Sequence, residues 1–342
     1  MRLLVIGGSV FLGRTFVQEA LRRGWEVTTF NRGRTQSDPE GVHAVRGDRE
    51  NEADLARLAE AGPWDAIVDV CGYVPRVVGA SVKALAGSAS TYLFISSINA
   101  RPGWPAEPVD ETSPRHESSP DAGPDDGDYG KLKVGCEMAV EQGFPGRTLI
   151  VEPGLIIGPH DRARRLTWWL RRAAEGGRMV APGSPEREVQ LIDARDLAIF
   201  GLDRIEAEDS GDYLVSGTPA NTTWGEFLGA CVAETGGKAE LVWVDDAVLT
   251  EHEVAVWTEL PLWSPEKGDL SAVWKPSSAK AVAAGLRCRP VAESIHDTAT
   301  WLFGEEGLDE AFGETRTGRE ARGITPERER ALLAAADAAQ AG

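Results

Sequence analysis

The sequence lacks any apolar stretch that could cross a membrane. No run within its 342 residues approaches the roughly 20 apolar residues that a membrane-spanning helix needs. The apolar run at residues 3–6 is too short for the core of a signal peptide, and no cleavage site follows it. These absences predict a cytoplasmic protein with no membrane partner.

Cysteine and histidine are scarce and do not cluster. The five histidines show neither HxH nor HExxH spacing, so we expect no metal site. The four cysteines form no CxxC pair, which is typical of small buried side chains in a reducing compartment. They are Cys71, Cys136, Cys231 and Cys288.

Positive charge is also in short supply. The chain carries 36 Lys and Arg against 54 Asp and Glu, a formal net charge of -18. Nucleic-acid binding needs a basic surface that neutralises phosphates. The charge therefore argues against a nucleic-acid partner, and it does not bear on the fold.

The first half of the sequence alternates short β-branched runs with helical periodicity. This pattern predicts an α/β fold with a doubly wound parallel sheet of the Rossmann type. Ligands bind such sheets at the carboxyl ends of the strands. Strands are expected at residues 3–6, 26–30, 43–46, 66–70, 92–96 and 148–152, and helices at residues 11–23, 52–61, 77–85 and 129–142.

The second half differs in composition, since eight of the 11 tryptophans follow residue 160. Caps at Asp193 and Thr223 predict helices after them, and a last helix, expected at residues 326–339, could dock, fray or form a dimer contact. These features indicate a smaller α+β C-terminal substrate domain. Its short strands are expected at residues 189–192, 212–215 and 241–244. We expect the dinucleotide-binding domain at residues 1–160, with 186–216 returning to its sheet, and the substrate domain with C-terminal helices at residues 161–185 and 217–342.

Residues 101–128 interrupt the periodicity with a segment rich in Pro, Asp, Ser and Gly. Loops of this length in compact domains are usually functional or disordered. Its position between a strand end and the next helix favours a lid over the active site. A solvated insertion is the alternative.

The turn after the first strand resembles a dinucleotide-binding loop. Gly7 and Gly8 follow the strand and Gly13 lies in the next helix, where glycine permits a tight turn and close approach to a pyrophosphate. The helix N-terminus adds free N–H groups and a partial positive charge. Val10 replaces the usual middle glycine, but a residue with negative φ can point its side chain away; an ordinary βα turn is the alternative. The expected pyrophosphate loop comprises Gly7, Gly8, Ser9, Val10, Phe11, Leu12 and Gly13.

The end of the second strand bears on cofactor choice. NAD sites usually carry Asp or Glu there for the ribose 2′-hydroxyl, whereas this chain has Asn31, Arg32 and Arg34. A guanidinium can pair with a 2′-phosphate through two hydrogen bonds. The sequence therefore favours NADP, with NAD as the alternative and solvated arginines as the simplest other interpretation.

Tyr129 and Lys133 lie four residues apart, on one face of a predicted helix. A free tyrosine has a pKa near ~10, and a neighbouring ammonium favours the phenolate. Such a pair can transfer protons near neutral pH and contact a cofactor ribose. Ser96 and Ser97 end a strand at the carboxyl edge, where a hydroxyl can orient a substrate oxygen or simply cap a turn.

Seven motifs cover nearly the first 200 residues in order: "GGSVFLG", "GD" at residues 47–48, "FISS", "PVDETSP", "YGKLK", "EPGLIIGPHD" and "QLIDARDLA". With them the chain resembles an extended or atypical member of the short-chain dehydrogenase/reductase superfamily, also called the NAD-dependent epimerase/dehydratase family. The tail resembles the family only loosely.

The resemblance implies a role for each matching position. Ser97, Tyr129 and Lys133 would form the catalytic triad, with Tyr129 as general acid/base. The other implied cofactor contacts are Asp48 and Arg49 at the adenine, Cys71, Gly72 and Tyr73 along the cofactor channel, and Pro153 and Gly154 near the nicotinamide, with Ser96, Leu155 and Ile156 beside them. We expect substrate contacts from Ser97, Ile98, Asn99, Trp168 and Gln190. Simple packing is the more ordinary role for Cys71 and Pro153.

Two further departures from the family pattern limit the function. Glu152 precedes the Pro-Gly pair where arginine is common. Ser97 is followed by Ile98 and Asn99, whereas sugar 4,6-dehydratases of the family carry an Asp-Glu pair there. Without that acid/base pair, dehydration is disfavoured.

The leading hypothesis is therefore an NAD(P)-dependent oxidoreductase acting on a carbonyl or alcohol carbon of a small molecule, with a homodimer compatible with the resemblance. A nucleotide-sugar epimerase with tightly bound NAD is the first alternative. Its diphosphate would need cations, for which several arginines are available, although a solvated helix face suits several of them better. They are Arg162, Arg164, Arg165, Arg171, Arg172 and Arg195.

A non-catalytic dinucleotide-binding or regulatory protein is the alternative from another class. Some relatives with a similar glycine loop resemble the chloroplast stem-loop RNA-binding proteins. The charge of -18 and the Tyr129/Lys133 pair both argue against RNA binding.

Overall fold

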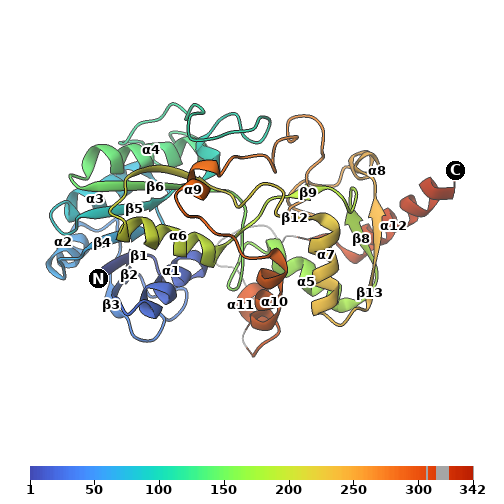
Figure 1. The fold of residues 1–342 in the computed structure, drawn as a ribbon, viewed down its shortest axis with the longest axis horizontal. Helices are drawn as coiled ribbons and strands as arrows, with labels where there is room; N and C mark the ends of the chain where they lie inside the picture. The colour runs from blue at the N-terminus through green and yellow to red at the C-terminus, as the bar shows by residue number, and fades with distance from the viewer. Residues whose placement is uncertain (306, 313–322, 342) are drawn as a thin grey trace.

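A computed structural model describes residues 1–305, 307–312 and 323–341 of the chain. Its centre is a seven-stranded sheet in which every paired strand is parallel, in the order β11-β6-β5-β4-β1-β2-β3 (Figure 1). The strands are β1 (Arg2–Ile6), β2 (Glu26–Asn31), β3 (His43–Arg46), β4 (Ala66–Asp69), β5 (Thr91–Ile95), β6 (Arg147–Pro153) and β11 (Gly211–Val215). The doubly wound α/β fold expected from the sequence is confirmed.

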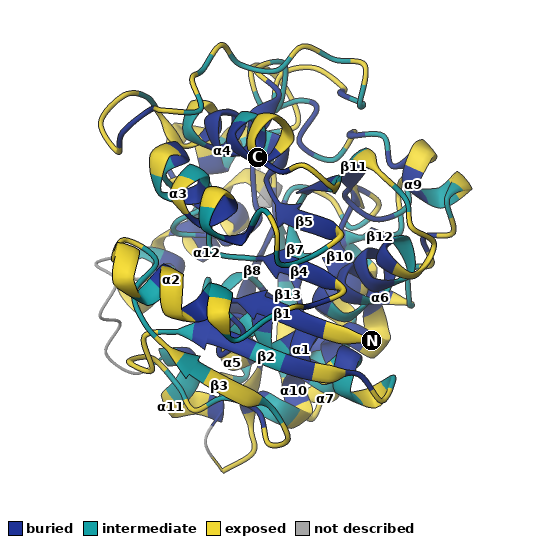
Figure 2. Cartoon of the chain, turned by 90° about the vertical axis from the view of Figure 1, so that its left-hand side faces the viewer, coloured by how far each residue is buried: buried dark blue, intermediate teal, exposed yellow. Residues whose placement is uncertain are grey.

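Two helical layers cover the two faces of this sheet. Successive side chains of β1 point to opposite faces, so Leu3 and Val5 pack with one layer and Leu4 and Ile6 with the other. The central strands β4 and β5 are buried along their whole length, whereas the edge strand β3 is mostly exposed (Figure 2). One layer contains α1 (Phe11–Arg22) and α6 (Ala194–Glu206); the other contains α2 (Glu52–Glu60), α3 (Pro75–Leu85) and α4 (Tyr129–Gly143).

The tryptophan-rich part forms a second hydrophobic core. Trp169 and Trp224 are fully buried and their rings meet edge to face, with centroids 5.6 Å apart. The tryptophans of this part therefore serve mainly to pack the second core. The elements outside the central sheet and its helical layers are β8 (Gly177–Pro182) with β13 (Ala239–Val244), β9 (Glu188–Val189) with β12 (Thr222–Thr223), β7 (Ile156–Ile157) with β10 (Ile192–Asp193), and the helices α5 (Arg165–Glu175), α7 (Trp224–Glu234), α8 (Asp246–Glu251), α9 (Ala279–Ala283), α10 (Val291–Leu302), α11 (Gly307–Phe312) and α12 (Pro326–Ala341). Of these, β10 and α9 contribute Ile192 and Ala281 to the core of the central sheet.

Local signals located only some of these elements: the strand expected at residues 241–244 lies in β13, and the helices expected after Thr223 and from residue 326 match α7 and α12. Asp193 caps α6 through the Arg195 N–H, and Thr223 starts α7 with a reciprocal capping box to Glu226. The strand expected at residues 189–192 is instead two short pieces, β9 and β10, which pair with different partners. Strand β8 was missed, because its short apolar core between glycine and proline lacks a β-branched run. The short strands β7 and β12 and the helices α5, α8, α9, α10 and α11 were not expected either.

The last helix docks onto the second core. Leu332, Leu333 and Ala336 of α12 are buried there, and Glu329 pairs with Arg172 of α5 at 2.7 Å. Within the described residues, no helix combines the length and apolarity that crossing a membrane requires.

The loop at residues 101–128 is packed against its surroundings rather than suspended over the sheet edge. The Ala122 carbonyl accepts from the Arg76 N–H at the start of α3, and the Val109 carbonyl from the Ser277 N–H. Arg101 is 2 % exposed. Trp104 is the residue of this loop that lines the main cavity. The expected lid is thus a fixed strap across α3, α4 and the segment near residue 277.

Candidate active site

A cavity of about 960 Å³ opens at the carboxyl ends of β1, β2, β4, β5 and β6. This is the edge at which doubly wound sheets bind their ligands. It gathers side chains from the first strand, from the start of α4 and from the segment near residue 162. Of the residues named from the sequence as cofactor, substrate or catalytic candidates, all except Gly72, Trp168 and Gln190 line it.

The turn between β1 and α1 is tight, and its glycines allow close approach of the backbone. Gly7 and Gly8 adopt φ angles of 111° and 86°, and a Cβ on Gly13 would lie 2.7 Å from the Gly8 nitrogen. Val10 has an extended backbone with φ -133°, so its position does not require glycine. No side chain caps α1 and no acidic residue lies in its first turn, which leaves the helix N-terminus open toward the cavity.

Asn31, at the end of β2, has its side-chain amide fully engaged within the protein. Its Nδ2 donates to the Gly7 carbonyl and to Asp38, and its Oδ1 accepts from the Gly33 N–H and from Arg46. Arg32 is the nearby cation with a loose partner, since Asp48 lies 3.9 Å away and the Arg32 side chain is 58% exposed. Arg32 and Arg34 both line the cavity.

Arg49 lies at the cavity wall, but its guanidinium is committed to another group. It donates two hydrogen bonds to Asp69, at 3.0 and 2.8 Å, and further bonds to Ser81. Asp69 is fully buried and also accepts from the Tyr92 hydroxyl. Burial raises the pKa of the neighbouring Cys71 thiol to about 11, so Cys71 is a neutral wall residue at physiological pH.

Lys133 lines the cavity and is buried, at 3 % exposure. Its ammonium donates to the Gly72 carbonyl at 2.9 Å and to the Ile95 carbonyl at 2.7 Å. The rings of Phe94 and Tyr73 flank it, with centroids 4.5 and 5.4 Å from Nζ. Tyr129, one turn earlier on α4, lines the same cavity and is half exposed.

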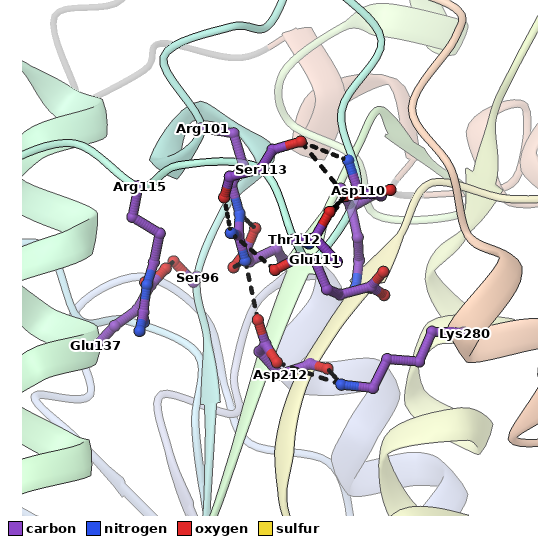
Figure 3. A network of polar contacts seen from close by, with 12 residues as sticks. Ser96, Arg101, Asp110, Glu111, Thr112, Ser113, Arg115, Glu137, Asp212 and Lys280 are labelled. Carbon is purple, nitrogen blue, oxygen red and sulfur yellow. Dashed lines mark hydrogen bonds and ion pairs between the residues drawn. The ribbon is translucent and has the colours of Figure 1, made fainter.

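The two serines after β5 have different hydrogen-bond partners. The Ser97 oxygen accepts from the Asn99 N–H and the Asn99 side-chain amide, both at 3.2 Å, and Ser97 lines the cavity. Ser96 turns toward α4 and donates to the buried carboxylate of Glu137 (Figure 3). Burial raises the pKa of Glu137, while hydrogen bonds from Ser96 and Arg115 oppose that rise.

A second buried carboxylate, Glu152, lies at the end of β6. It accepts two hydrogen bonds from Arg101, at 2.6 and 2.8 Å, and Arg101 also reaches Asp212 of β11 (Figure 3). Burial is the main cause that raises the pKa of Glu152 to about 7, against the opposing effect of Arg101. This ion pair fixes the start of the 101–128 strap to the sheet.

The comparisons with known proteins agree with this geometry. The model of the NAD dependent epimerase/dehydratase family matches residues 3–214. The chain belongs to this family. It is accordingly an enzyme of the short-chain dehydrogenase/reductase type. No curated protein matches it in sequence.

Solved structures of similar fold include several epimerases. UDP-glucose 4-epimerase of Thermus thermophilus in complex with NAD is 20% identical with a TM-score of 0.63, over 89% of this chain and 99% of that one. A putative epimerase from Burkholderia cenocepacia J2315 is 18% identical with a TM-score of 0.64, over 87% and 97%. Thermotoga maritima UDP-glucose 4-epimerase with UDP-glucose is 16% identical with a TM-score of 0.64, over 88% and 98%. At these identities the likeness concerns the fold.

This member of the epimerase/dehydratase family departs from the sequence expectation at the substrate end. Trp168 packs in the second core and does not line the cavity. Gln190 is buried, with its amide donating to the Gly217 and Pro276 carbonyls. Both positions correct the expected substrate contacts. The large apolar ring of Trp168 packs in the core, and the Gln190 amide is already bound to two backbone carbonyls. Gly72 contributes its carbonyl to Lys133 instead of a lining surface.

Of the six arginines considered for a diphosphate, the structure brings Arg162 and Arg165 to the cavity. The others have partners elsewhere: Arg164 donates to the Ala311 and Phe312 carbonyls, Arg171 lies over the Phe312 ring, Arg172 pairs with Glu329, and Arg195 with Asp193 and Asp297.

Sequence reasoning missed several lining residues, among them Trp104 and Thr258. Trp104 is held by a hydrogen bond from its ring N–H to the Val273 carbonyl. Neither residue stands in a recognisable motif, so only the tertiary contacts bring them to the site.

Proposed function

We propose that the protein is an NAD(P)-dependent oxidoreductase that moves a hydride between the nicotinamide and a carbonyl or alcohol carbon of a small molecule. One observation carries the proposal: the buried ammonium of Lys133 lies one helical turn from Tyr129, in a cavity that also contains Ser97. Tyrosine, lysine and serine in this arrangement suit proton transfer to a substrate oxygen.

The residues around the cavity fit a dinucleotide. Gly13 leaves no room for a Cβ beside Gly8, and the uncapped α1 N-terminus offers N–H groups for a pyrophosphate. Six cationic and three acidic side chains line a cavity in a chain of net charge -18, which favours an anionic ligand. Arg32 and Arg34 favour NADP over NAD, because Asn31 has no polar group left to offer a ribose.

When bound, the nicotinamide supplies or accepts the hydride, and the chain supplies the proton chemistry. The lone pairs of Ser97 accept from Asn99, so its O–H is directed to donate to a substrate oxygen. Tyr129 transfers the proton to or from that oxygen. Two N–H groups of Lys133 hold backbone carbonyls, and the third remains for Tyr129 or a ribose hydroxyl.

The first experiment combines cofactor identification with one substitution. Nicotinamide released from denatured purified protein is identified by mass, and NADP and NAD are titrated in parallel. We expect exchangeable binding with NADP preferred. Tyr129→Phe should lower turnover of reducible carbonyl compounds by about 10²-fold or more, with the Kd for NADP nearly unchanged. Failure of the wild type to bind either cofactor contradicts the proposal.

A nucleotide-sugar epimerase is the second candidate, favoured by Arg162 and Arg165 at the cavity. These cations suit a diphosphate, and UDP-glucose is the ligand of the Thermotoga maritima relative. Stoichiometric NAD that survives purification would favour this activity over the reductase, because an epimerase returns its own hydride.

A further inference from the structure

The loop that carries Arg32 and Arg34 is closed at its base by a polar cluster outside the cavity. Asp38 accepts from the Thr29 hydroxyl at 2.9 Å and from the Asn31 amide at 2.7 Å, and it pairs with Arg46. Its side chain is only 6% exposed, and these partners lower its pKa despite burial. Asp38 is therefore a buried anion that joins the two ends of the loop.

The same cluster fixes the conformation inside the loop. Gly33 has φ 64° and donates its N–H to Asn31, and a Cβ at this position would lie 2.9 Å from the Arg46 Nε. Arg46 thus covers Gly33 while it binds Asn31. Neither Arg46 nor Asp38 lines the cavity, whereas Arg32, Gly33, Arg34 and Thr35 do.

The cluster also reaches the pyrophosphate turn. Asn31 donates to the Gly7 carbonyl, and Thr29, the other partner of Asp38, lies under Gly8. The loop of residues 32–37 is therefore held in register with the turn between β1 and α1. Ordering a loop before binding removes the entropy cost of ordering it on binding.

From this geometry we infer that Asp38 is a positioning residue for cofactor selectivity: it preforms the 32–37 loop as the recognition element for the phosphorylated ribose of NADP. The inference rests on the proposed function, and it adds a residue that touches no cofactor atom. Because only NADP needs Arg32 and Arg34, loss of Asp38 should weaken NADP binding more than NAD binding.

The test measures the Kd values of NADPH and NADH by fluorescence titration for the wild type, Asp38→Asn and Asp38→Ala. We expect Asp38→Ala to raise the Kd for NADPH by about tenfold while the Kd for NADH changes much less, and Asp38→Asn to retain part of the selectivity because it can still accept from Thr29. Asp209→Asn is the matched control, since Asp209 accepts from Tyr213 and Arg204 far from the cavity.

Arg46→Gln provides a second route if the Asp38 variants do not fold, as judged by circular dichroism. It should lower selectivity in the same direction. An equal loss for both cofactors, or no change in a folded variant, overturns the inference while leaving the oxidoreductase standing. A wild type that prefers NADH overturns it as well, and a wild type that binds neither overturns the proposed function too.

Discussion

At the scale of single residues, adjacent side chains of this site have different partners. Ser96 and Ser97 both line the cavity, yet the Ser96 hydroxyl donates to Glu137 whereas the Ser97 oxygen accepts from Asn99. Lys133 is buried, and its described hydrogen-bond and ion-pair partners include no carboxylate. Backbone carbonyls and aromatic rings surround its ammonium at the cavity instead.

Gly13 provides a prediction at this scale. Gly13→Ala would place a Cβ 2.7 Å from the Gly8 nitrogen, so the turn must move. We expect a loss of about 1–3 kcal/mol in the free energy of unfolding, typical of overpacking, together with a large loss of NADP affinity. Urea denaturation and NADPH titration measure the two effects.

Gly229→Ala is the control for this substitution. Gly229 lies in α7, and apart from its chain neighbours and the nearby backbone of the helix no atom lies within 4 Å of the position of a Cβ. Alanine there should leave cofactor binding unchanged and stabilise the helix by roughly 0.5–1 kcal/mol. Unchanged NADP affinity in Gly13→Ala would contradict the role assigned to the turn.

At the scale of elements, α4 holds the end of β5 at successive positions. Lys133 binds the Ile95 carbonyl, Glu137 binds the Ser96 hydroxyl, and Tyr129 faces the cavity with Ser97. Residues spaced by four lie on one helical face, so a single helix can align three consecutive residues of a strand end. Arg115 of the 101–128 strap ties this arrangement from outside through Glu137.

We therefore expect Glu137→Gln to lower kcat about tenfold with little change in KM or in the Kd for NADP, because it weakens the hold on Ser96 without touching the ligand. Steady-state kinetics with any carbonyl compound that the wild type reduces measures this. Glu141→Gln, which removes the other carboxylate partner of Arg115, should have near wild-type kinetics. Equal effects of the two substitutions would show that α4 is held by Arg115 and that the Ser96 contact is unimportant.

At the scale of the whole molecule, a buried ion pair links the strap, the sheet and its edge strand. Arg101 joins Glu152 of β6 and Asp212 of β11, and Lys280 approaches Asp212 from α9. The sequence departure at Glu152 is thus compensated by Arg101 from the strap. Removing one partner of such a pair leaves an uncompensated buried charge, which is more costly than the pair itself.

This network predicts a pH dependence of stability. The pKa of Glu152 is raised from 4.5 to about 7 in the folded protein, so the folded state binds more protons than the unfolded state between those values. The Glu152 contribution to stability is full below pH 4.5 and is lost as pH rises through 7. Urea denaturation at pH 5 and pH 8 should show that Glu152→Gln loses this component, whereas Gln at the exposed Glu60 keeps it. Parallel pH profiles for wild type and Glu152→Gln would refute the assignment.

The sequence by itself determined the sheet, the glycine turn between β1 and α1, and the family. The apolar run of β1, the glycines at 7, 8 and 13, and the spacing of Tyr129 and Lys133 are local patterns that can be recognised in the sequence alone. The caps Asp193 and Thr223 were visible for the same reason, since a cap interacts with residues two or three positions away.

Only the tertiary structure decided which polar side chains reach the cavity. Arg162 and Arg165 line it while Arg164 turns to α11, and Trp104 and Thr258 enter from segments that lie far apart in the sequence. The Gln190 amide is bound to backbone carbonyls away from the cavity. Asp38 holds the 32–37 loop through its contacts with Thr29, Asn31 and Arg46. A side chain's direction and partners depend on elements distant in the sequence, and no local periodicity encodes them.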